Sequence, residues 1–328
     1  MPKFSRVGLA VVGFLILHVS TVFAQITWVS NAPLPEVREG AAGAVAPGPD
    51  GLPKVYVMHG YSSGDTNNLR IYDPVADIWS AGPNSPGALS SEAYFGATAD
   101  DGSGDLKTYI IGGRTTLTQN LKYNPITNIW ATNAPMPTGR AGHGVAVVDN
   151  LIYAIGGRTG TTPFDPIPLN INQVYDPVAD TWAALTPMPT ARSGVGAVAV
   201  GGLIYVFGGW SLVGSTPTLQ NLVEVYDPAA DSWSTAAPMP TARAYLGATE
   251  CGGKIYAIGG MISTTPVTSS MTNIVEVYDP ATDAWTTETP MPTARAELVV
   301  VNVEGQVFAM GGGIFGSSLA ANQSFTCQ

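Results

Sequence analysis

Residues 194–209 read GVGAVAVGGLIYVFGG and residues 222–234 read LVEVYDPAADSWS. Apolar runs that alternate with a glycine pair and with an Asp-Pro turn are typical of short β-strands joined by tight turns. The expected strands cover residues 194–200, 203–207, 222–226 and 232–234. No helical period of apolar residues appears anywhere after residue 24. The stretch therefore predicts a four-stranded β unit.

The same unit is repeated along the chain of 328 residues, as a nearly periodic tryptophan shows. Successive steps are 51, 51, 52, 51 and 52 residues, with the tryptophans at Trp28, Trp79, Trp130, Trp182, Trp233 and Trp285. A fixed period of this size indicates one supersecondary unit copied six times. The fold class predicted is therefore all-β with repeated sheets.

Two turn signals recur with the tryptophan. A double glycine, which permits positive φ at a strand end, stands at Gly112-Gly113, Gly156-Gly157, Gly208-Gly209, Gly259-Gly260 and Gly311-Gly312, with His59-Gly60 in the first unit. A Tyr-Asp-Pro turn stands at residues 72–74, 175–177, 226–228 and 278–280, and residues 123–125 read Tyr-Asn-Pro. Asp or Asn before Pro favours a turn because the side chain accepts from local N–H groups.

The double glycine, a tyrosine 10 to 18 residues later and a tryptophan six or seven residues after it resemble the kelch motif. The resemblance covers nearly all of residues 25–328 and implies a six-bladed kelch β-propeller, in which each repeat is one four-stranded blade and the blades pack around a channel. The first tryptophan has no strands before it, and the last repeat ends without one. We therefore expect residues 25–31 to complete the last blade and close the ring. The expected blades are 36–80, 87–131, 137–183, 189–234, 240–286, and 292–328 with 25–31.

The first 24 residues are expected to be a secretory signal peptide. Lys3 and Arg6 precede an apolar run, and Val22 and Ala24 are the small residues expected before a cleavage site. The alternative is a retained membrane anchor, although the apolar run is shorter than the ~20 residues that a spanning helix needs. The predicted location is secreted, periplasmic or on the cell surface, with no membrane insertion after cleavage.

Two cysteines, Cys251 and Cys327, are present, and the sequence leaves open whether they pair. Removal of residues 1–24 changes the net charge from −10 to −12. Such an acidic chain lacks the basic surface that nucleic-acid binding requires, so we expect no nucleic-acid partner. We expect a monomer without a cofactor.

Binding is expected on the face that carries the loops after the double glycines, because variable loops on a rigid scaffold are a usual seat of binding. Insertions lengthen three of these loops, at residues 159–172, 211–221 and 262–273. Five arginines precede the first strands of their blades, at Arg38, Arg140, Arg192, Arg243 and Arg295, and Glu92 holds the matching position in the second unit. Arg114 and Arg158 directly follow double glycines, and Tyr61 and Trp210 hold the same position in other blades.

In six-bladed kelch domains that bind acidic peptides, arginines at matching positions line the pocket, so the resemblance implies that these residues bind a ligand. Guanidinium groups suit carboxylates, sulfates and phosphates. The alternative is that a cation repeated in each blade ties the blades together through carbonyls or through Glu224 and Glu276.

His59 and His143 are the only histidines after residue 24, too few for a zinc or copper centre, and the Asp-Pro-x-x-Asp turns lack a calcium-loop pattern. We therefore expect no metal. The favoured function is an exported binding module for a protein, peptide or carbohydrate, with anionic ligands among the candidates. One alternative is an enzyme of the sialic acid mutarotase type, which exported six-bladed kelch proteins include. Another is a structural ring in a cell-surface complex.

Overall fold

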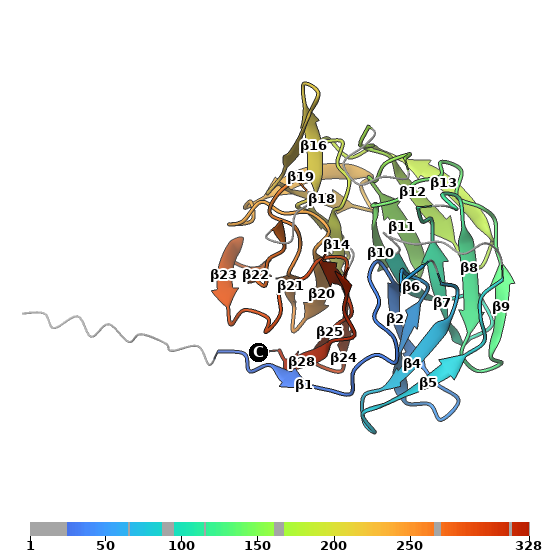
Figure 1. Ribbon diagram of the computed structural model, residues 1–328. Coiled ribbons are helices and arrows are strands. Elements are labelled where there is room, and N and C mark those ends of the chain that lie inside the picture. Colours follow the sequence, from blue (N-terminus) through green and yellow to red (C-terminus); the bar gives the residue numbers. More distant parts are fainter. Residues whose placement is uncertain are drawn as a thin grey trace, which may run out of the picture.

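The computed structural model describes residues 25–64, 66–86, 95–114, 116–160, 167–265, 270–314 and 317–327. These residues form six four-stranded antiparallel sheets and two short hairpins. Figure 1 shows the sheets side by side around a ring, like the blades of a propeller. The predicted all-β six-bladed propeller is confirmed. No helix in the part of the chain that the structure describes is long and apolar enough to cross a membrane.

Each blade runs from an inner strand at the axis to an outer strand. Blades 1 to 3 contain β2 (Ala42–Pro47), β3 (Pro53–Met58), β4 (Leu69–Asp73) and β5 (Ile78–Gly82); β6 (Phe95–Asp100), β7 (Leu106–Ile111), β8 (Asn120–Asn124) and β9 (Ile129–Thr132); and β10 (Gly144–Val148), β11 (Leu151–Ile155), β12 (Asn172–Asp176) and β13 (Thr181–Leu185). Blades 4 to 6 contain β14 (Gly196–Val200), β15 (Leu203–Phe207), β18 (Val223–Asp227) and β19 (Ser232–Ala236); β20 (Gly247–Cys251), β21 (Lys254–Ile258), β22 (Val275–Asp279) and β23 (Ala284–Glu288); and β24 (Val299–Val303), β25 (Gln306–Met310), β28 (Asn322–Thr326) and β1 (Val29–Ser30).

The ring closes with strands from both ends of the described chain. Strand β1 pairs with β28 through Val29↔Ser324 and Ser30↔Gln323, and Trp28 packs edge-on against Phe325 with ring centroids 4.8 Å apart. This confirms the predicted closure by an N-terminal strand.

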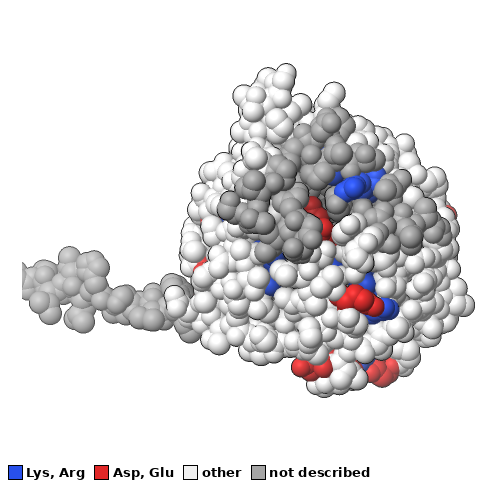
Figure 2. Space-filling view, viewed as in Figure 1, with Lys and Arg blue, Asp and Glu red and all other residues white. Residues whose placement is uncertain are grey.

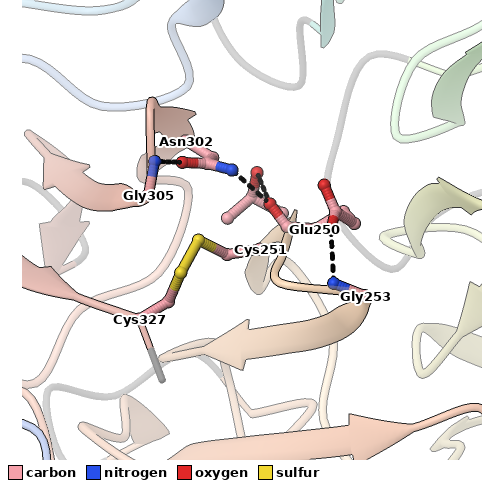
Figure 3. The surroundings of a disulfide bond; sticks show 7 residues. Glu250, Cys251, Gly253, Asn302, Gly305 and Cys327 are labelled. Atoms are coloured by element: carbon pink, nitrogen blue, oxygen red, sulfur yellow. Dashed lines mark hydrogen bonds between the residues drawn. A yellow bond between two sulfur atoms is a disulfide. The ribbon is translucent and has the colours of Figure 1, made fainter.

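A disulfide, which the sequence left open, adds a second closure. It joins Cys251 at the end of β20 to Cys327 just after β28 (Figure 3), and the two Cα atoms lie 6.1 Å apart. This separation lies within the range that a disulfide allows. The bond fastens the sixth blade to the fifth.

The periodic tryptophan holds each blade to the one before it. In blade 4, Trp233 donates from Nε1 to the carbonyl of Thr186 at 2.9 Å. The N–H of Thr186 donates to Asp231 at 2.9 Å, and the same carboxylate accepts from the hydroxyl of Tyr226 at 2.6 Å. Asp231 has the positive φ that the turn requires. Tyr, Asp and Trp of one repeat thus bind a single backbone segment of the preceding blade, which explains their shared period.

The core lies between neighbouring blades. Between blades 3 and 4, for example, Tyr153 and Ile155 pack with Ile204, Val206 and Tyr226. Near the axis the backbones come so close that side chains must be small. A Cβ added to Gly96 would collide with the carbonyl of Gly43 in the next blade.

The loops predicted after two double glycines contain strands that the sequence did not reveal. Strands β16 (Trp210–Val213) and β17 (Thr216–Leu219) pair as a hairpin that projects from the ring in Figure 1, and β26 (Gly313–Ile314) pairs with β27 (Ser317–Ser318). Alternating polar and apolar residues and Gly214 at positive φ account for the first hairpin. The pattern is too short to be recognised without the surrounding fold.

Candidate functional site

Two faces of the propeller differ in what they carry. The turn-bearing face holds the hairpin turns between the first and second strands and the Asp-Pro turns. The loop-bearing face holds the connections after the double glycines and the connections between blades. On that face, the residue after each repeated arginine pairs with the residue after a double glycine: Glu39↔Tyr61, Ala141↔Arg158, Ser193↔Trp210, Ala244↔Met261 and Ala296↔Gly313. These bridges place Tyr61, Arg158 and Trp210 on the same face as the segments that follow the repeated arginines.

The five repeated arginines lie beneath this mouth with fully buried side chains. Arg192 donates from Nη1 to the carbonyl of Gly208 at 2.7 Å and from Nη2 to the carboxylate of Glu224 at 2.7 Å. Arg243 pairs in the same way with Glu276. The partners belong to the same blade, so each arginine links the entry of the blade to its second and third strands.

Two other repeated arginines use a neutral glutamine at the position of Glu224. Arg140 donates to Gln173 at 2.5 Å and to the carbonyl of Ala154 at 2.7 Å. Arg295 donates to Gln323 at 2.8 Å and to the carbonyl of Ala309 at 3.0 Å. Arg38 differs, because it donates to Asn68 just before β4 at 2.6 Å and pairs with the carboxylate of Glu36 at 3.3 Å.

Burial opposes the charged form of these side chains. It lowers the pKa of Arg140 to about 9 and the pKa of Arg38 and of Arg295 to about 10. Burial also lowers the pKa of Arg192, where the negative charge of Glu224 opposes the effect. Since solvent does not reach these groups and carbonyls bind them, the geometry favours a structural role. Each arginine ties together its own blade, however, and not neighbouring blades as the sequence alternative expected.

Arg158 is also fully buried, but it points across the mouth rather than into its own blade. Its Nη1 donates to the hydroxyl of Tyr245 at 3.1 Å, and its guanidinium carbon lies 5.9 Å from the centre of that ring. Trp210, which is buried as well, donates from Nε1 to the same hydroxyl at 3.3 Å. The three side chains connect blades 3, 4 and 5 at the axis. Tyr245 was not predicted from the sequence.

Five described residues with positive φ lie in series around the axis at this level, and two of these five are not glycine. Gly194 donates its N–H to the carbonyl of Gly142, and Tyr245, Glu297 and Gly40 continue the series with distances of 2.8 to 2.9 Å. All five have φ between 53° and 67°. The two that are not glycine, Tyr245 and Glu297, have φ of 54° and 53°. A left-handed conformation at a non-glycine residue costs about 1 to 3 kcal/mol and is concentrated at functional sites.

Glu39 contributes a second carboxylate beside this series. A Cβ added to Gly313 in the neighbouring blade would collide with Oε2 of Glu39, and Gly313 pairs with Ala296, which precedes Glu297. Glu39 and Glu297 therefore lie on adjoining segments at the mouth. The only sequence signal for them was the departure from glycine or alanine at repeated positions.

Of the other predicted residues, Arg114 and Tyr61 are half-buried at the mouth. Glu92 lies outside the described residues, as does the segment 1–24 that was expected to be a signal peptide. In the view of Figure 2 most of the visible surface is uncharged, with isolated basic and acidic groups.

Neither histidine is placed for catalysis at this mouth. His59 is fully buried, with Nε2 2.5 Å from the hydroxyl of Ser85. Burial, aided by the positive charge of Arg38, lowers the pKa of His59 to about 4. His143 is buried too, and burial together with Arg140 holds its pKa well below the usual range. Both side chains are neutral at pH 7.

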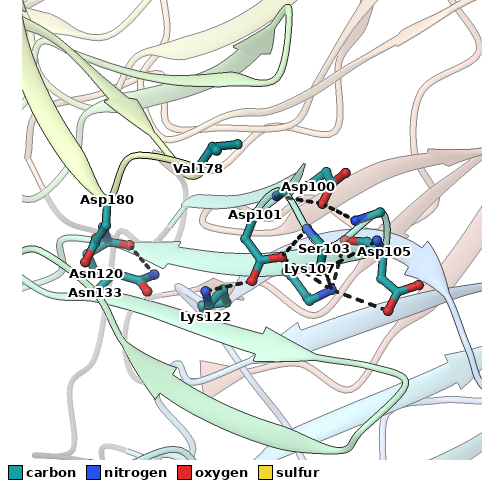
Figure 4. Close-up of polar contacts among 12 residues, drawn as sticks. Asp100, Asp101, Ser103, Asp105, Lys107, Asn120, Lys122, Asn133, Val178 and Asp180 are labelled. Atoms are coloured by element: carbon teal, nitrogen blue, oxygen red, sulfur yellow. Dashed lines mark hydrogen bonds and ion pairs between the residues drawn. The ribbon is translucent and has the colours of Figure 1, made fainter.

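No group of three or more His, Cys, Asp or Glu side chains able to hold a metal occurs among the described residues. The aspartates of the turn between β6 and β7 are paired with lysine side chains (Figure 4). Lys107 donates to Ser103 at 2.8 Å and lies 3.7 Å from both Asp101 and Asp105. Burial works against ionisation of Asp101, but hydrogen bonds from Lys122 and Ser103 outweigh it and keep the pKa of Asp101 well below its usual range.

Comparison with known proteins agrees with this architecture. Residues 96–312 match the family model described as the KLHDC2/KLHL20/DRC7 Kelch-repeats domain. Kelch-like protein 35 of Mus musculus is 28% identical over 241 residues, which is 74% of this chain and 38% of that protein. Alpha-scruin of Limulus polyphemus is 31% identical over 188 residues, 56% of this chain and 20% of that protein. The chain spans about a third of the length of the first curated relatives that it matches.

Among solved structures, one titled "Structure of YjhT" superposes with a TM-score of 0.72. The match covers 88% of this chain and 95% of the other, at 18% sequence identity. At that identity the likeness shows the fold alone.

Proposed function

The chain belongs to the kelch-repeat family, and we propose that it is an exported binding module whose loop-bearing face recognises a protein, peptide or carbohydrate. The arrangement of the connections on that face carries the proposal. Blades 3, 4 and 5 are consecutive, and their connections at residues 156–171, 208–222 and 259–274 are longer than those at 59–68 and 112–119 in blades 1 and 2. Long loops gathered over three neighbouring blades of a rigid scaffold are typical of a recognition surface.

The composition of the insertions limits the classes of ligand that this face can recognise. Residues 159–172, 211–221 and 262–273 contain a single ionisable side chain, Asp165, and are rich in threonine, serine and proline. Among the described residues, Arg114 and Glu297 add charge at the mouth, where both are half-buried. This supports a ligand with an uncharged, hydroxyl-rich or apolar body and a single acidic group that faces Arg114.

Export is supported by the disulfide between Cys251 and Cys327, because such bonds persist in oxidising compartments. Sequencing of the N-terminus of the full chain after expression in a secreting host tests it. We expect the mature chain to begin at Gln25. A protein that retains residues 1–24 and stays with the membrane would contradict the proposal.

A thermal-shift screen of residues 25–328 tests the binding function. The probes are N-acetylneuraminate, neutral oligosaccharides, and acidic peptides rich in serine and threonine, each at low and moderate salt. A probe at a hundredfold excess over its Kd raises the free energy of unfolding by about 2.7 kcal/mol.

Variants then locate the site. We expect Arg114→Ala to abolish the shift, while Lys254→Ala removes one positive charge at the turn-bearing end of β21 and leaves the shift unchanged. Equal effects of the two variants would refute the assignment. A flat response across all probes would instead favour a structural ring, to be sought by capture of a macromolecular partner.

A second candidate function is the opening and reclosure of a sugar ring, favoured by the carboxylates of Glu39 and Glu297 beside the Arg158–Tyr245 pair. Such a reaction needs a general acid and base together with an anion clamp. NMR spectroscopy of anomer interconversion, starting from a single anomer of N-acetylneuraminate, tests it. The proposal requires acceleration by the folded protein and loss of that acceleration in Glu297→Gln.

A further inference from the structure

The channel opens on the turn-bearing face into a cavity that the proposed function does not use. The cavity has a volume of about 520 Å³ and is walled by the inner strands of all six blades. Towards the loop-bearing face the channel narrows to a space of about 100 Å³, lined by residues such as Gly43, Gly96 and Ala197. The wide end is thus a separate pocket, on the opposite side of the ring from the loop insertions.

Strand register shows which residues share one level of this pocket. One position in each inner strand pairs with the residue that precedes the Tyr or Phe of the second strand, so the six positions are equivalent. They are Val45, Thr98, Val147, Ala199, Glu250 and Asn302. All six line the cavity, and Glu250 is the only ionisable residue among its lining residues. Blades 1, 3 and 4 contribute an apolar wall, whereas blades 5 and 6 contribute a carboxylate and an amide.

The structure holds Glu250 from three sides (Figure 3). Its backbone carbonyl accepts from Nδ2 of Asn302 at 3.0 Å. Its carboxylate oxygen Oε1 accepts from the N–H of Gly253 at 2.8 Å. The next residue, Cys251, is fixed by the disulfide to Cys327. The backbone at Glu250 is therefore fixed, and the hydrogen bond from Gly253 orients one oxygen of its carboxylate.

No lysine or arginine in the described part of the chain pairs with this carboxylate. The described ion pairs that involve lysine or arginine use Glu36, Glu224, Glu276 and aspartates of the turns. Within the same described residues, Oε2 of Glu250 has no hydrogen-bond partner. Glu250 is half-buried, and a carboxylate partly withdrawn from water attracts a cation more strongly than one in open solvent.

We infer that this pocket is a second binding site and that it takes an aliphatic primary ammonium group. The ammonium donates to Oε2 of Glu250, and the hydrocarbon chain lies against Val45, Val147 and Ala199. The negative charge of Glu250 disfavours anionic ligands, and the narrow space of about 100 Å³ keeps bulky ligands from passing through to the loop-bearing face. A small free amine and the side chain of lysine present the same chemistry, and the experiment separates them.

The probes are pentylamine and Nα-acetyl-lysine methylamide, titrated separately by calorimetry into residues 25–328 at pH 7 and low salt. Glu250→Gln keeps the acceptor for Gly253 and removes only the charge. Glu304→Gln is the matched control, because Glu304 is exposed in the neighbouring turn between β24 and β25 on the same face. We expect Glu250→Gln to weaken the binding of pentylamine by tenfold or more, which corresponds to about 1.4 kcal/mol, and Glu304→Gln to leave it within about twofold.

Ala199→Leu adds an independent test, since it fills the apolar wall without a change of charge. We expect it to weaken pentylamine while the protein melts at the wild-type temperature. Binding of the lysine derivative as tightly as pentylamine would identify a lysine side chain of a partner as a competent source, and binding of pentylamine alone would identify a free amine. Binding of neither amine, or equal losses in Glu250→Gln and Glu304→Gln, would overturn the inference.

Discussion

Replacement of Arg192 by methionine should separate a structural arginine from a ligand-binding one. The change keeps the aliphatic stem but removes the donors to Gly208 and Glu224. Glu224 is only 3% exposed, so its charge would be left buried without its partner. Removal of one member of a buried ion pair costs about 3 to 5 kcal/mol.

Arg140→Met is the matched comparison, because its side-chain partner is the neutral Gln173. An unsatisfied neutral group costs about 1 to 3 kcal/mol, so Arg140→Met should be about 2 kcal/mol less costly than Arg192→Met. Urea unfolding at pH 7, followed by tryptophan fluorescence, measures both. The double variant Arg192→Met/Glu224→Leu should recover most of the lost stability. If Arg192→Met cost under 1 kcal/mol, or no more than Arg140→Met, the reasoning would be refuted.

Three other predictions concern the fold and its pH dependence. Loss of the disulfide in Cys251→Ala/Cys327→Ala should lower the free energy of unfolding by about 4 kcal/mol, since the bond closes a loop of 76 residues; a loss below 1 kcal/mol in urea would contradict it. The pKa of His59 is about 4 in the folded chain against 6.5 for the free side chain, so stability is present above pH 6.5 and is lost as pH falls towards 4. That loss should be about 3 kcal/mol and absent in His59→Asn, and identical pH profiles of wild type and variant would count against it. Glu297→Gly should be more stable than Glu297→Ala by about 1 kcal/mol because of the positive φ, and the opposite order in thermal melts would show that the backbone there is unstrained.

Sequence reasoning captured the architecture because the determining interactions are repeated. Four blades bind the preceding blade through the same three groups, as Tyr226, Asp231 and Trp233 bind Thr186, and the tryptophan bond is made in all six. A contact that recurs six times leaves a period in the sequence. The closure by β1 followed from the same logic, since an incomplete first and last repeat complete each other.

The candidate site was less predictable, for the opposite reason. The repeated arginines stood out in the sequence, yet Arg192 and its counterparts are buried within single blades. Tyr245 and Glu297 differ from the glycines at equivalent positions, but that equivalence appears only when the backbone ring is seen. The disulfide depended on a Cα separation that sequence spacing does not give. A residue that occurs in only one blade leaves no period in the sequence, so its role is seen only in the structure.

The most direct test measures stability and affinity on the same two variants. Arg114→Ala and Arg192→Ala are compared in residues 25–328, with the strongest probe from the thermal-shift screen. We predict that Arg114→Ala loses affinity for the probe and melts at the wild-type temperature, whereas Arg192→Ala melts lower and its folded fraction binds with wild-type affinity. The reverse pattern, with affinity lost in Arg192→Ala and unchanged in Arg114→Ala, would contradict a structural role for the buried arginines and a binding role for the mouth.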